Sequence, residues 1–348
     1  MHITNRNLLY LFMEDISLKR KFYITLLICA LIISCFSGCS SSDNKLGKNE
    51  DTIHIVTTIF PEYDWVNNIL GDNPAKADVT LLLDNGVDLH SYQPTAEDII
   101  KISTCDLFIY VGGESDKWVD DVLKEAKNKD MIVINLLDTL GDSVKEEELV
   151  EGMEGEEEEE GEDEDEEEGP EYDEHVWLSL KNSSILVNSI DEAIEKLDKD
   201  NASTYQQNAK AYTDKLNKLD NEYKEVVDNA SIKTLLFGDR FPFRYLTEDY
   251  NLDYYAAFIG CSAETEASFE TITFLAQKVD ELSLKNVITI EGTNHKIAET
   301  IIQNTKDKNQ QILVMDSMQS STTKDYENGT NYLSIMEKNL EVLKEALK

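Results

Sequence analysis

The stretch STYQQNAKAYTDKLNKLDNEYKEVVDNA, residues Ser203–Ala230, predicts one long amphipathic helix near the middle of a chain of 348 residues. Ser203 or Thr204 is suited to cap its N-terminus. Its apolar residues recur at alternating steps of four and three, which places them on one helical face: Tyr205, Ala209, Tyr212, Leu216, Leu219, Tyr223 and Val226. About 30 helical residues would extend about 45 Å. We therefore expect a rigid helix that runs along a whole lobe.

Short β-branched runs lie on both sides of this helical region. Four runs precede it and four follow it, with helical patterns between consecutive runs: Ile53–Ile59, Val79–Leu83, Leu107–Gly112, Met131–Leu136, Thr234–Gly238, Tyr254–Gly260, Asn286–Gly292 and Gln311–Ser317. Strands that alternate with helices are typical of parallel sheets. We expect an α/β fold of two lobes, each a four-stranded, mostly parallel sheet with flanking helices, joined by a long rigid backbone helix.

The N-terminal residues predict export. The basic residues Lys19–Lys21 precede an apolar run that is too short and too soon interrupted for a comfortable membrane span. A basic segment, an apolar segment and small residues before a cleavage point are typical of a secretory signal. Ser37-Gly38 directly before Cys39 resembles a bacterial lipobox, in which Cys39 becomes the lipidated first residue of the mature protein. Cys35 is a weaker second candidate, and an uncleaved anchor is the alternative.

These patterns divide the chain into five parts. We expect a signal peptide over residues 1–38, a lipid-anchored tether over 39–52, an N-terminal metal-binding lobe over 53–180 that includes a disordered acidic loop over 146–174, a connecting helix over 181–230, and a C-terminal metal-binding lobe over 231–348.

The formal net charge of −38 is extreme, and much of it is concentrated in one segment. Residues Glu151–Glu174 include 17 acidic and no basic side chains. Because phosphate binding needs Lys and Arg, this balance excludes nucleic acid as a partner and favours cations. The acidic run either concentrates divalent cations weakly or is a solvated insertion with no role in metal binding.

Metal-binding side chains follow several of the predicted strands. Ligands of open parallel sheets bind beyond the carboxyl ends of the strands. His90 lies in the glycine-containing stretch NGVDLHSYQPTAEDI, Asn85–Ile99, and His175 lies in DEHVWLSL directly after the acidic run. Asp239, Glu291 and Asp316 follow strands of the second half. We therefore expect a site in a cleft between the lobes.

Four motifs together resemble the solute-binding lipoproteins of zinc and manganese ABC importers. They are TTIFPEYDWVNNILG, GVDLHSYQPTAEDI, DLFIYVGGESDKWVDDVL and DEHVWLSL, and with the lipobox in front the resemblance covers nearly the whole mature chain. The resemblance implies two α/β lobes bridged by a long helix, with a metal held between them. His90 and His175 match the two histidine ligands of the first lobe.

The second lobe matches this family less completely. In FGDRFPFRYLTEDY, Arg240 falls where the family has a histidine or glutamate, and a guanidinium has no lone pair for a metal. Asp239 would then ligate through a re-aimed loop, or it forms an ion pair with Arg240 that is only structural. Asp316 in LVMDSM matches an aspartate that the family places at a strand end. Further candidate ligands are Cys261, Glu264 and Glu291.

Two imidazoles with one or two carboxylates favour Zn²⁺, with Mn²⁺ as the alternative. The sequence has no nucleophile–base pair at suggestive spacing and no phosphate loop, so we expect a binding protein rather than an enzyme. The resemblance implies a lipid-anchored monomer at the extracytoplasmic face of the bacterial cell membrane, which delivers the metal to an ABC transporter permease and its ATPase. The alternatives are a metal-dependent surface hydrolase and a binding protein retuned to a non-metal, anionic solute through Arg240.

Overall fold

Eight short strands form two separate sheets in the computed structural model, which describes residues 52–155, 171–260, 266–292 and 294–348. The strands are β1 (His54–Thr57), β2 (Asp78–Leu81), β3 (Leu107–Tyr110), β4 (Ile132–Asn135), β5 (Thr234–Phe241), β6 (Asp253–Ile259), β7 (Asn286–Ile290) and β8 (Gln311–Met315). The sheet orders are β2-β1-β3-β4 and β6-β5-β7-β8, and all neighbouring strands are parallel. The predicted fold of two four-stranded α/β lobes is confirmed.

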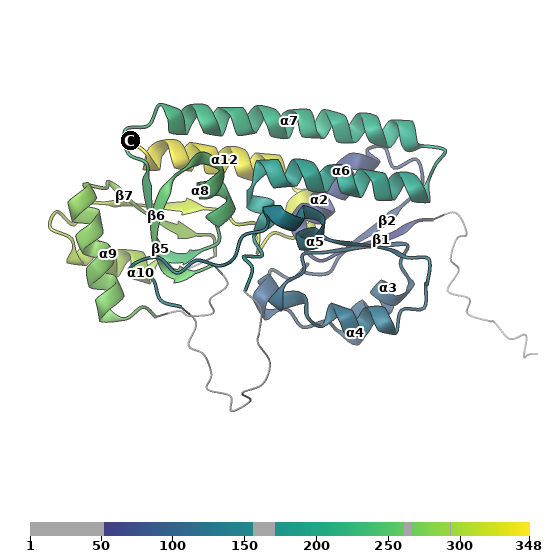
Figure 1. Cartoon of the computed structure of the whole chain (residues 1–348), viewed down its shortest axis with the longest axis horizontal. Coiled ribbons are helices and arrows are strands. Elements are labelled where there is room, and N and C mark those ends of the chain that lie inside the picture. Colours follow the sequence, from purple (N-terminus) through teal and green to yellow (C-terminus); the bar gives the residue numbers. More distant parts are fainter. Residues whose placement is uncertain (1–51, 156–170, 261–265, 293) are drawn as a thin grey trace, which may run out of the picture. The chain divides into compact units, whose positions relative to one another are not determined.

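Helices cover both faces of each sheet (Figure 1). In the first lobe they are α2 (Phe60–Leu70), α3 (Ala96–Thr104), α4 (Val119–Lys124) and α5 (Leu136–Leu140). In the second lobe they are α8 (Arg244–Tyr250), α9 (Phe269–Leu282), α10 (Lys296–Asn304) and α12 (Tyr332–Ala346). The short helix α11 (Thr323–Glu327) instead lies against the first lobe, where Tyr326 packs on Tyr63 of α2. Single 3-10 turns complete the described elements: η1 (Leu89–Ser91), η2 (Glu114–Asp116), η3 (Gly141–Ser143) and η4 (Val176–Leu178).

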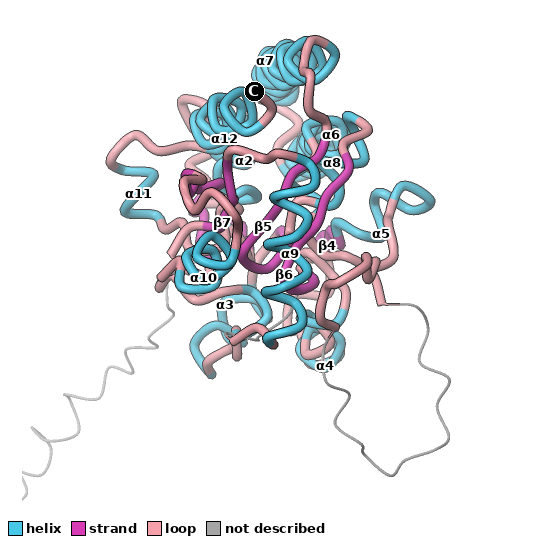
Figure 2. Tube along the Cα trace, turned by 90° about the vertical axis from the view of Figure 1, so that its left-hand side faces the viewer, coloured by secondary structure: helices cyan, strands magenta, loops and turns pink. Residues whose placement is uncertain are grey.

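The strands of the second sheet are apolar on both faces because helices cover both sides of this sheet. Figure 2 shows its strands between α12 on one side and α9 and α10 on the other. Leu236 and Phe258 belong to the apolar cluster of α9 and α10, whereas the residues that directly follow them, Phe237 and Ile259, belong to the main core. Because successive side chains of a strand point to opposite faces, a parallel sheet covered on both sides needs continuous apolar runs.

The region between the lobes contains two helices, α6 (Leu180–Leu197) and α7 (Ala202–Asp228), rather than the single connecting helix predicted over 181–230. The break is a polar turn that Asp198 stabilises. The side chains of Asn201 and Tyr205 both donate to Asp198 Oδ2 at 2.7 Å. Asn201 is the residue before the first turn of α7, so the predicted cap at Ser203 or Thr204 lies two or three residues too late.

Helix α7 has the predicted apolar face and connects the lobes through it. Six of the seven predicted positions are buried, and at the C-terminal end Val227 is buried where Val226 was expected. The Tyr212 hydroxyl donates to Asp64 Oδ2 of α2 at 2.8 Å, and the Tyr223 hydroxyl donates to the Met336 carbonyl of α12 at 2.6 Å. Figure 1 shows α7 extending past both α6 and α12. One helix therefore packs on parts of both lobes and limits their relative motion.

The boundaries predicted for a disordered acidic loop over 146–174 are wrong at both ends. Glu146 pairs with Tyr172 in an antiparallel bridge, and Glu154 pairs with Phe258 of β6 in a parallel bridge. The backbone N–H of Glu154 donates to the Ala257 carbonyl at 2.9 Å. Met153 is buried against the core. The ends of the segment are therefore part of the fold, and the rest of the acidic run, residues 156–170, lies outside the described residues.

Other predictions also fall outside the described residues. They concern the signal peptide, the tether with Cys39, and the candidate ligands Cys261 and Glu264. None of the helices in the described part of the chain combines the length and the apolar character that crossing a bilayer requires.

Glu62, in the first turn of α2, is fully buried, and this burial raises its pKa from 4.5 to about 8. Between these values the folded protein holds a proton that the unfolded chain has released. The stability of the metal-free protein should therefore fall as the pH rises from 6.5 to 8, by up to about 1.4 kcal/mol per pH unit. Urea denaturation across this range would measure the slope.

The variant Glu62→Gln should flatten this slope because its amide does not titrate. Glu299→Gln, which removes an exposed acid of α10, should leave the slope unchanged. Asp64 and Asp116 act in the same direction only at lower pH, because burial raises the pKa of each to about 6. An unaltered slope in the Glu62→Gln protein would contradict the assignment.

Candidate metal centre

His90 is held by a short turn after strand β2. Gly86 adopts a φ of +72°, which an L side chain rarely adopts, and Asp88 then caps the 3-10 turn η1. Asp88 Oδ1 accepts the backbone N–H of His90 at 3.1 Å. Leu89 is buried and anchors the turn in the core. The loop is therefore rigid enough to present the imidazole in one orientation.

His175 is fixed in the same way. Asp173 Oδ1 accepts the backbone N–H of His175 at 2.9 Å and lies 3.0 Å from its Nδ1. The next three residues form η4, and all of them are buried. Trp177 packs beside the imidazole with ring centroids 5.3 Å apart, and its Nε1–H donates to the Ser317 carbonyl of the second lobe at 2.9 Å. His175 itself is fully buried.

The two histidines, 85 residues apart in the sequence, face each other. The Nε2 atoms of His90 and His175 are 3.3 Å apart, and the ring centroids are 5.2 Å apart. A tetrahedral zinc ion with Zn–N bonds of about 2.0–2.1 Å places two of its nitrogen ligands about 3.3 Å apart. The pair therefore already has the separation that zinc imposes.

On the other side of each ring, a polar group contacts Nδ1 and keeps Nε2 directed at the space between the two histidines. His90 Nδ1 lies 2.8 Å from Ser115 Oγ and 3.4 Å from Glu174 Oε2. Glu174 is itself held, because its Oε1 accepts the backbone N–H of Ser115 at 2.8 Å. Asp173 plays the same part for His175. Such partners of the second ring nitrogen are typical of metal-binding histidines.

The two imidazoles share their proton unequally. Burial, and then the neighbouring His175, lower the pKa of His90 to about 3. Burial also acts to lower the pKa of His175, but the carboxylate of Asp173 outweighs it and holds that pKa above its ordinary value. Of the two imidazoles, His175 is therefore the one that takes up a proton more readily. Because histidine binds a metal in its neutral form, metal binding competes with this protonation.

The second-lobe carboxylates predicted as ligands bind backbone groups of their own lobe. Asp316 Oδ1 accepts the N–H of Met318 at 2.8 Å. Glu291 accepts the N–H and the hydroxyl of Ser317, each at 2.7 Å. Burial raises the pKa of both acids. In the described part of the chain, no three His, Cys, Asp or Glu side chains are arranged to hold a metal. A full coordination shell therefore needs a ligand beyond the histidine pair.

Asp239 and Arg240 lie in β5 rather than in a loop after it, since this strand continues to Phe241 through an irregularity between Phe237 and Arg240. Asp239 accepts two backbone N–H groups, that of Arg240 at 2.9 Å and that of Ile290 at 3.3 Å. The Arg240 side chain reaches the first lobe, where its Nη2 donates to Asp88 Oδ2 at 2.5 Å. Arg240 thus pairs with a carboxylate of the first lobe, a contact that neither sequence hypothesis, the re-aimed loop or the local ion pair, includes.

The residues that position the histidines were not predicted from the sequence. Both histidines follow an aspartate by two positions, in DLH and DEH, and in both cases that aspartate accepts the backbone N–H of the histidine. This repeated pattern could have been found in the sequence. Ser115 could not, because it reaches His90 from a different loop, 25 residues further on.

Gly260, which follows β6, packs against the His175 ring. A Cβ atom there would lie 2.9 Å from the Phe241 carbonyl oxygen, 3.1 Å from His175 Cε1 and 3.2 Å from its Nδ1. Gly260→Ala should therefore displace the imidazole and weaken metal binding by about 10-fold or more, as loss of a supporting residue typically does. Gly155→Ala is a matched control, because its Cβ would make only ordinary contacts with Leu149. Equal affinities of the two variants would contradict this role.

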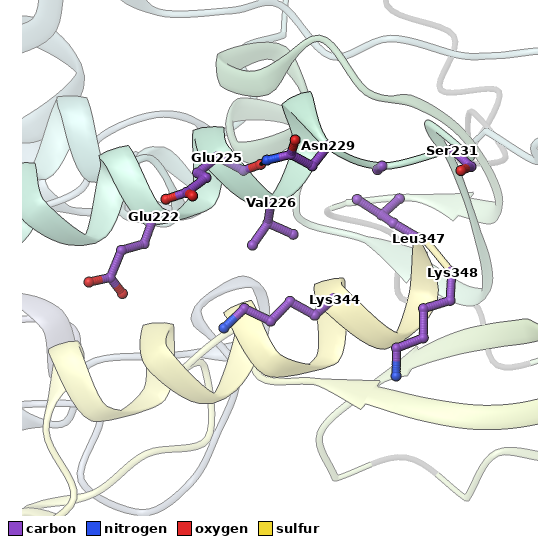
Figure 3. Close-up of a pocket in the computed structure, with 9 residues that line it drawn as sticks. Glu222, Glu225, Val226, Asn229, Ser231, Lys344, Leu347 and Lys348 are labelled. Atoms are coloured by element: carbon purple, nitrogen blue, oxygen red, sulfur yellow. Dashed lines mark hydrogen bonds between the residues drawn. The ribbon is translucent and has the colours of Figure 1, made fainter.

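A hollow elsewhere on the described surface does not share these features. Figure 3 shows it between the C-terminal ends of α7 and α12, with acids of α7 opposite lysines of α12. Its lining is Glu222, Glu225, Val226, Asn229, Ala230, Ser231, Lys344, Leu347 and Lys348. The lining contains no histidine or cysteine, so the histidine pair is the better candidate for a metal site.

Comparison with known proteins points to the same chemistry. The family model described as zinc-uptake complex component A, periplasmic (ZnuA), matches residues 55–346. The chain is 32% identical over 319 residues to the high-affinity zinc uptake system protein ZnuA of Bacillus subtilis (strain 168), which covers 92% of this chain and 95% of that protein. It is 31% identical over 318 residues to the zinc-binding lipoprotein AdcA of Streptococcus pneumoniae (strain ATCC BAA-255 / R6), which covers 91% of this chain.

The chain spans 59% of the length of that AdcA protein. The crystal structure of the Zn(II)-bound ZnuA-like domain of Streptococcus pneumoniae AdcA has the same fold, with a TM-score of 0.65 and 29% sequence identity. The match covers 85% of this chain and 99% of that domain. The two lobes and the helices that join them therefore correspond to a known zinc-binding domain.

Proposed function

The chain belongs to the family of periplasmic zinc-uptake complex component A proteins, whose model matches residues 55–346, and we propose that it captures zinc outside the membrane for import by an ABC transporter. The relatives named above are a zinc uptake protein and a zinc-binding lipoprotein. Zinc is the cargo in this proposal, and the protein's task is to bind it and then release it to the transporter.

The observation that carries the proposal is the geometry of His90 and His175. Their Nε2 atoms are 3.3 Å apart, and each Nδ1 faces an oxygen partner that orients its ring. The two imidazoles would supply two of the four or five ligands that zinc binds in proteins. Asp239, Asp316 and Glu291 remain proposed ligands of the second lobe, and each of them also accepts backbone N–H groups.

Zinc is preferred to manganese because both ligands that the fold brings together are imidazoles. Nitrogen ligands suit zinc, whereas manganese favours sites dominated by carboxylate and other oxygen ligands. The zinc-binding relatives support the same choice. Manganese binding would become favourable only if several carboxylates joined the histidines.

The proposed setting is the extracytoplasmic face of the cell membrane. A lipid on Cys39 would anchor the protein, the residues up to about position 52 would form a tether, and an ABC permease with its ATPase would receive the zinc. We propose that the protein acts as a monomer, because both histidines and the second-lobe candidates belong to one chain. The assignment as a component of a zinc-uptake complex supports this setting.

Binding is proposed rather than catalysis. A metal-dependent hydrolase needs an open metal position for water and a general base beside it. The carboxylates nearest the histidines, Asp173 and Glu174, face Nδ1 atoms and so orient the rings. An anionic solute bound by Arg240 is disfavoured because that guanidinium already pairs with Asp88.

Isothermal titration of the metal-stripped protein tests this function. One zinc ion should bind per chain with a dissociation constant below about 1 µM, and manganese should bind at least 10-fold more weakly. Zinc binding should also weaken as the pH is lowered, because a protonated imidazole cannot bind a metal. A protein that takes up no zinc, or that prefers manganese, would contradict the proposal.

A further inference from the structure

The second lobe meets the histidine pair with a positive charge. Arg240 Nη2 donates to Asp88 Oδ2 at 2.5 Å, although the two residues are 152 positions apart in the sequence. The other oxygen of the same carboxylate, Oδ1, lies 3.9 Å from His90 Nε2. That nitrogen is the atom that faces His175. The guanidinium is therefore separated from the proposed zinc position by a single carboxylate group.

Arg240 is held firmly in this place. Its backbone N–H donates to Asp239 Oδ1, and Asp239 Oδ2 accepts the N–H of Ile290 in the neighbouring strand, so the end of β5 is fixed. The side chains of Arg240 and Asp88 are only 20% and 19% exposed. Solvent therefore screens the charge less than it would screen that of a surface arginine.

Asp88 is fixed from several sides as well. Its Oδ1 accepts the backbone N–H of His90. The Gln319 amide, oriented so that its nitrogen faces the carboxylate, donates to Asp88 Oδ1 at 2.8 Å. A cation that enters beside His90 must therefore share this carboxylate with Arg240.

We propose that Arg240 sets the zinc affinity of the histidine pair by acting as a built-in competing cation. A guanidinium does not lose its proton in proteins, so its charge opposes the entry of a divalent ion at any physiological pH. It also occupies the carboxylate that would otherwise attract that ion. Zinc is then bound less tightly and released faster, which suits a protein that must pass its cargo on. The inference rests on the proposed function.

Substitutions of Arg240 distinguish the effect of its charge on zinc affinity from the effect of its shape. Arg240→Gln removes the charge and should tighten zinc binding by about 10-fold or more, as expected for a nearby like charge of low solvent exposure. Arg240→Lys keeps the charge and should stay within about 3-fold of the wild type. Arg240→Met is a second neutral variant in case the first fails to fold. Competition with a chelator of known zinc affinity would measure all four proteins, and urea denaturation would verify that each is folded.

Arg244→Gln is the matched control for total charge. Arg244 lies in the same lobe and pairs with Glu148, not with Asp88. Loss of the Arg244 charge should leave zinc affinity unchanged, since its partner Glu148 is an exposed carboxylate outside the histidine pair. Tightening in both Arg240→Gln and Arg244→Gln to the same degree would mean that only net charge matters, and it would overturn the inference.

The other outcomes are equally distinct. If the wild type binds zinc and a folded neutral variant of Arg240 binds it equally or more weakly, the inference is overturned while the proposed function stands. If the wild type binds no zinc, the proposed function fails, and the inference fails with it. Tighter binding by Arg240→Gln or Arg240→Met, together with unchanged binding by Arg240→Lys and Arg244→Gln, would support the inference.

Discussion

Replacing His175 with alanine is expected to lower the affinity for zinc by at least about 100-fold, because loss of a ligand should exceed the 10- to 100-fold cost of losing a residue that only orients one. His175 is fully buried, and its Nε2 faces His90 Nε2 at 3.3 Å. Asp173, the carboxylate bonded to this ring, cannot take its position, because it lies behind the ring, at Nδ1. Titration with zinc in competition with a chelator would measure the loss.

His90→Ala should have an effect of similar size, because a metal held between the two rings depends on both. His54→Gln is the matched control. His54 belongs to β1 and lies beside Asp78, with its Nδ1 3.6 Å from Asp78 Oδ2. The control should bind zinc like the wild type. Retention of wild-type affinity in either alanine variant would exclude that histidine as a ligand.

Replacing Trp177 with alanine is expected to destabilise the fold by about 3–5 kcal/mol, the usual cost of deleting a large buried aromatic side chain. Trp177 is 1% exposed, and its Nε1–H donates to the Ser317 carbonyl of the second lobe. Its own carbonyl accepts the hydroxyl of Tyr332 at 2.7 Å. The residue thus joins the histidine turn of the first lobe to the second lobe. Urea denaturation of the metal-free protein would give the change in the free energy of unfolding.

Trp177→Phe should be less costly, because it keeps most of the apolar contact. It loses the smaller remainder of that contact and the hydrogen bond, which contributes about 1 kcal/mol. Trp118→Phe, at a half-buried position of the first lobe, is the control for general loss of an indole. A change below 1 kcal/mol for Trp177→Ala would show that this contact does not hold the lobes together. Zinc affinity should also fall in Trp177→Ala, since the ring packs on His175.

The architecture could be predicted because it depends on local patterns. The eight apolar runs became strands, and the apolar stripe of Ser203–Ala230 became the buried face of α7. The break between α6 and α7 was missed because it depends on side-chain hydrogen bonds to Asp198, made by Asn201 and Tyr205. The extension of β5 was missed because Gly238 and the polar pair after it are typical of a loop. In the fold, their neighbours β6 and β7 keep them in the strand.

The candidate site could be predicted only in part, because some of its contacts join residues that are far apart in the sequence. His90 and His175 follow structural signals in their own loops, so the sequence indicates both. The contact between Arg240 and Asp88 joins residues 152 positions apart, and no local pattern indicates it. The hydrogen bonds of Asp316 and Glu291 likewise depend on how the loop after β8 folds back. The second-lobe ligands therefore remain predictions.

A crystal structure of the zinc-loaded protein, with anomalous data collected at the zinc edge, tests the central claim most directly. The predicted result is one strong anomalous peak about 2.0–2.1 Å from Nε2 of both His90 and His175. A zinc peak bound by carboxylates alone, with the two imidazoles still in contact with each other, would contradict the account.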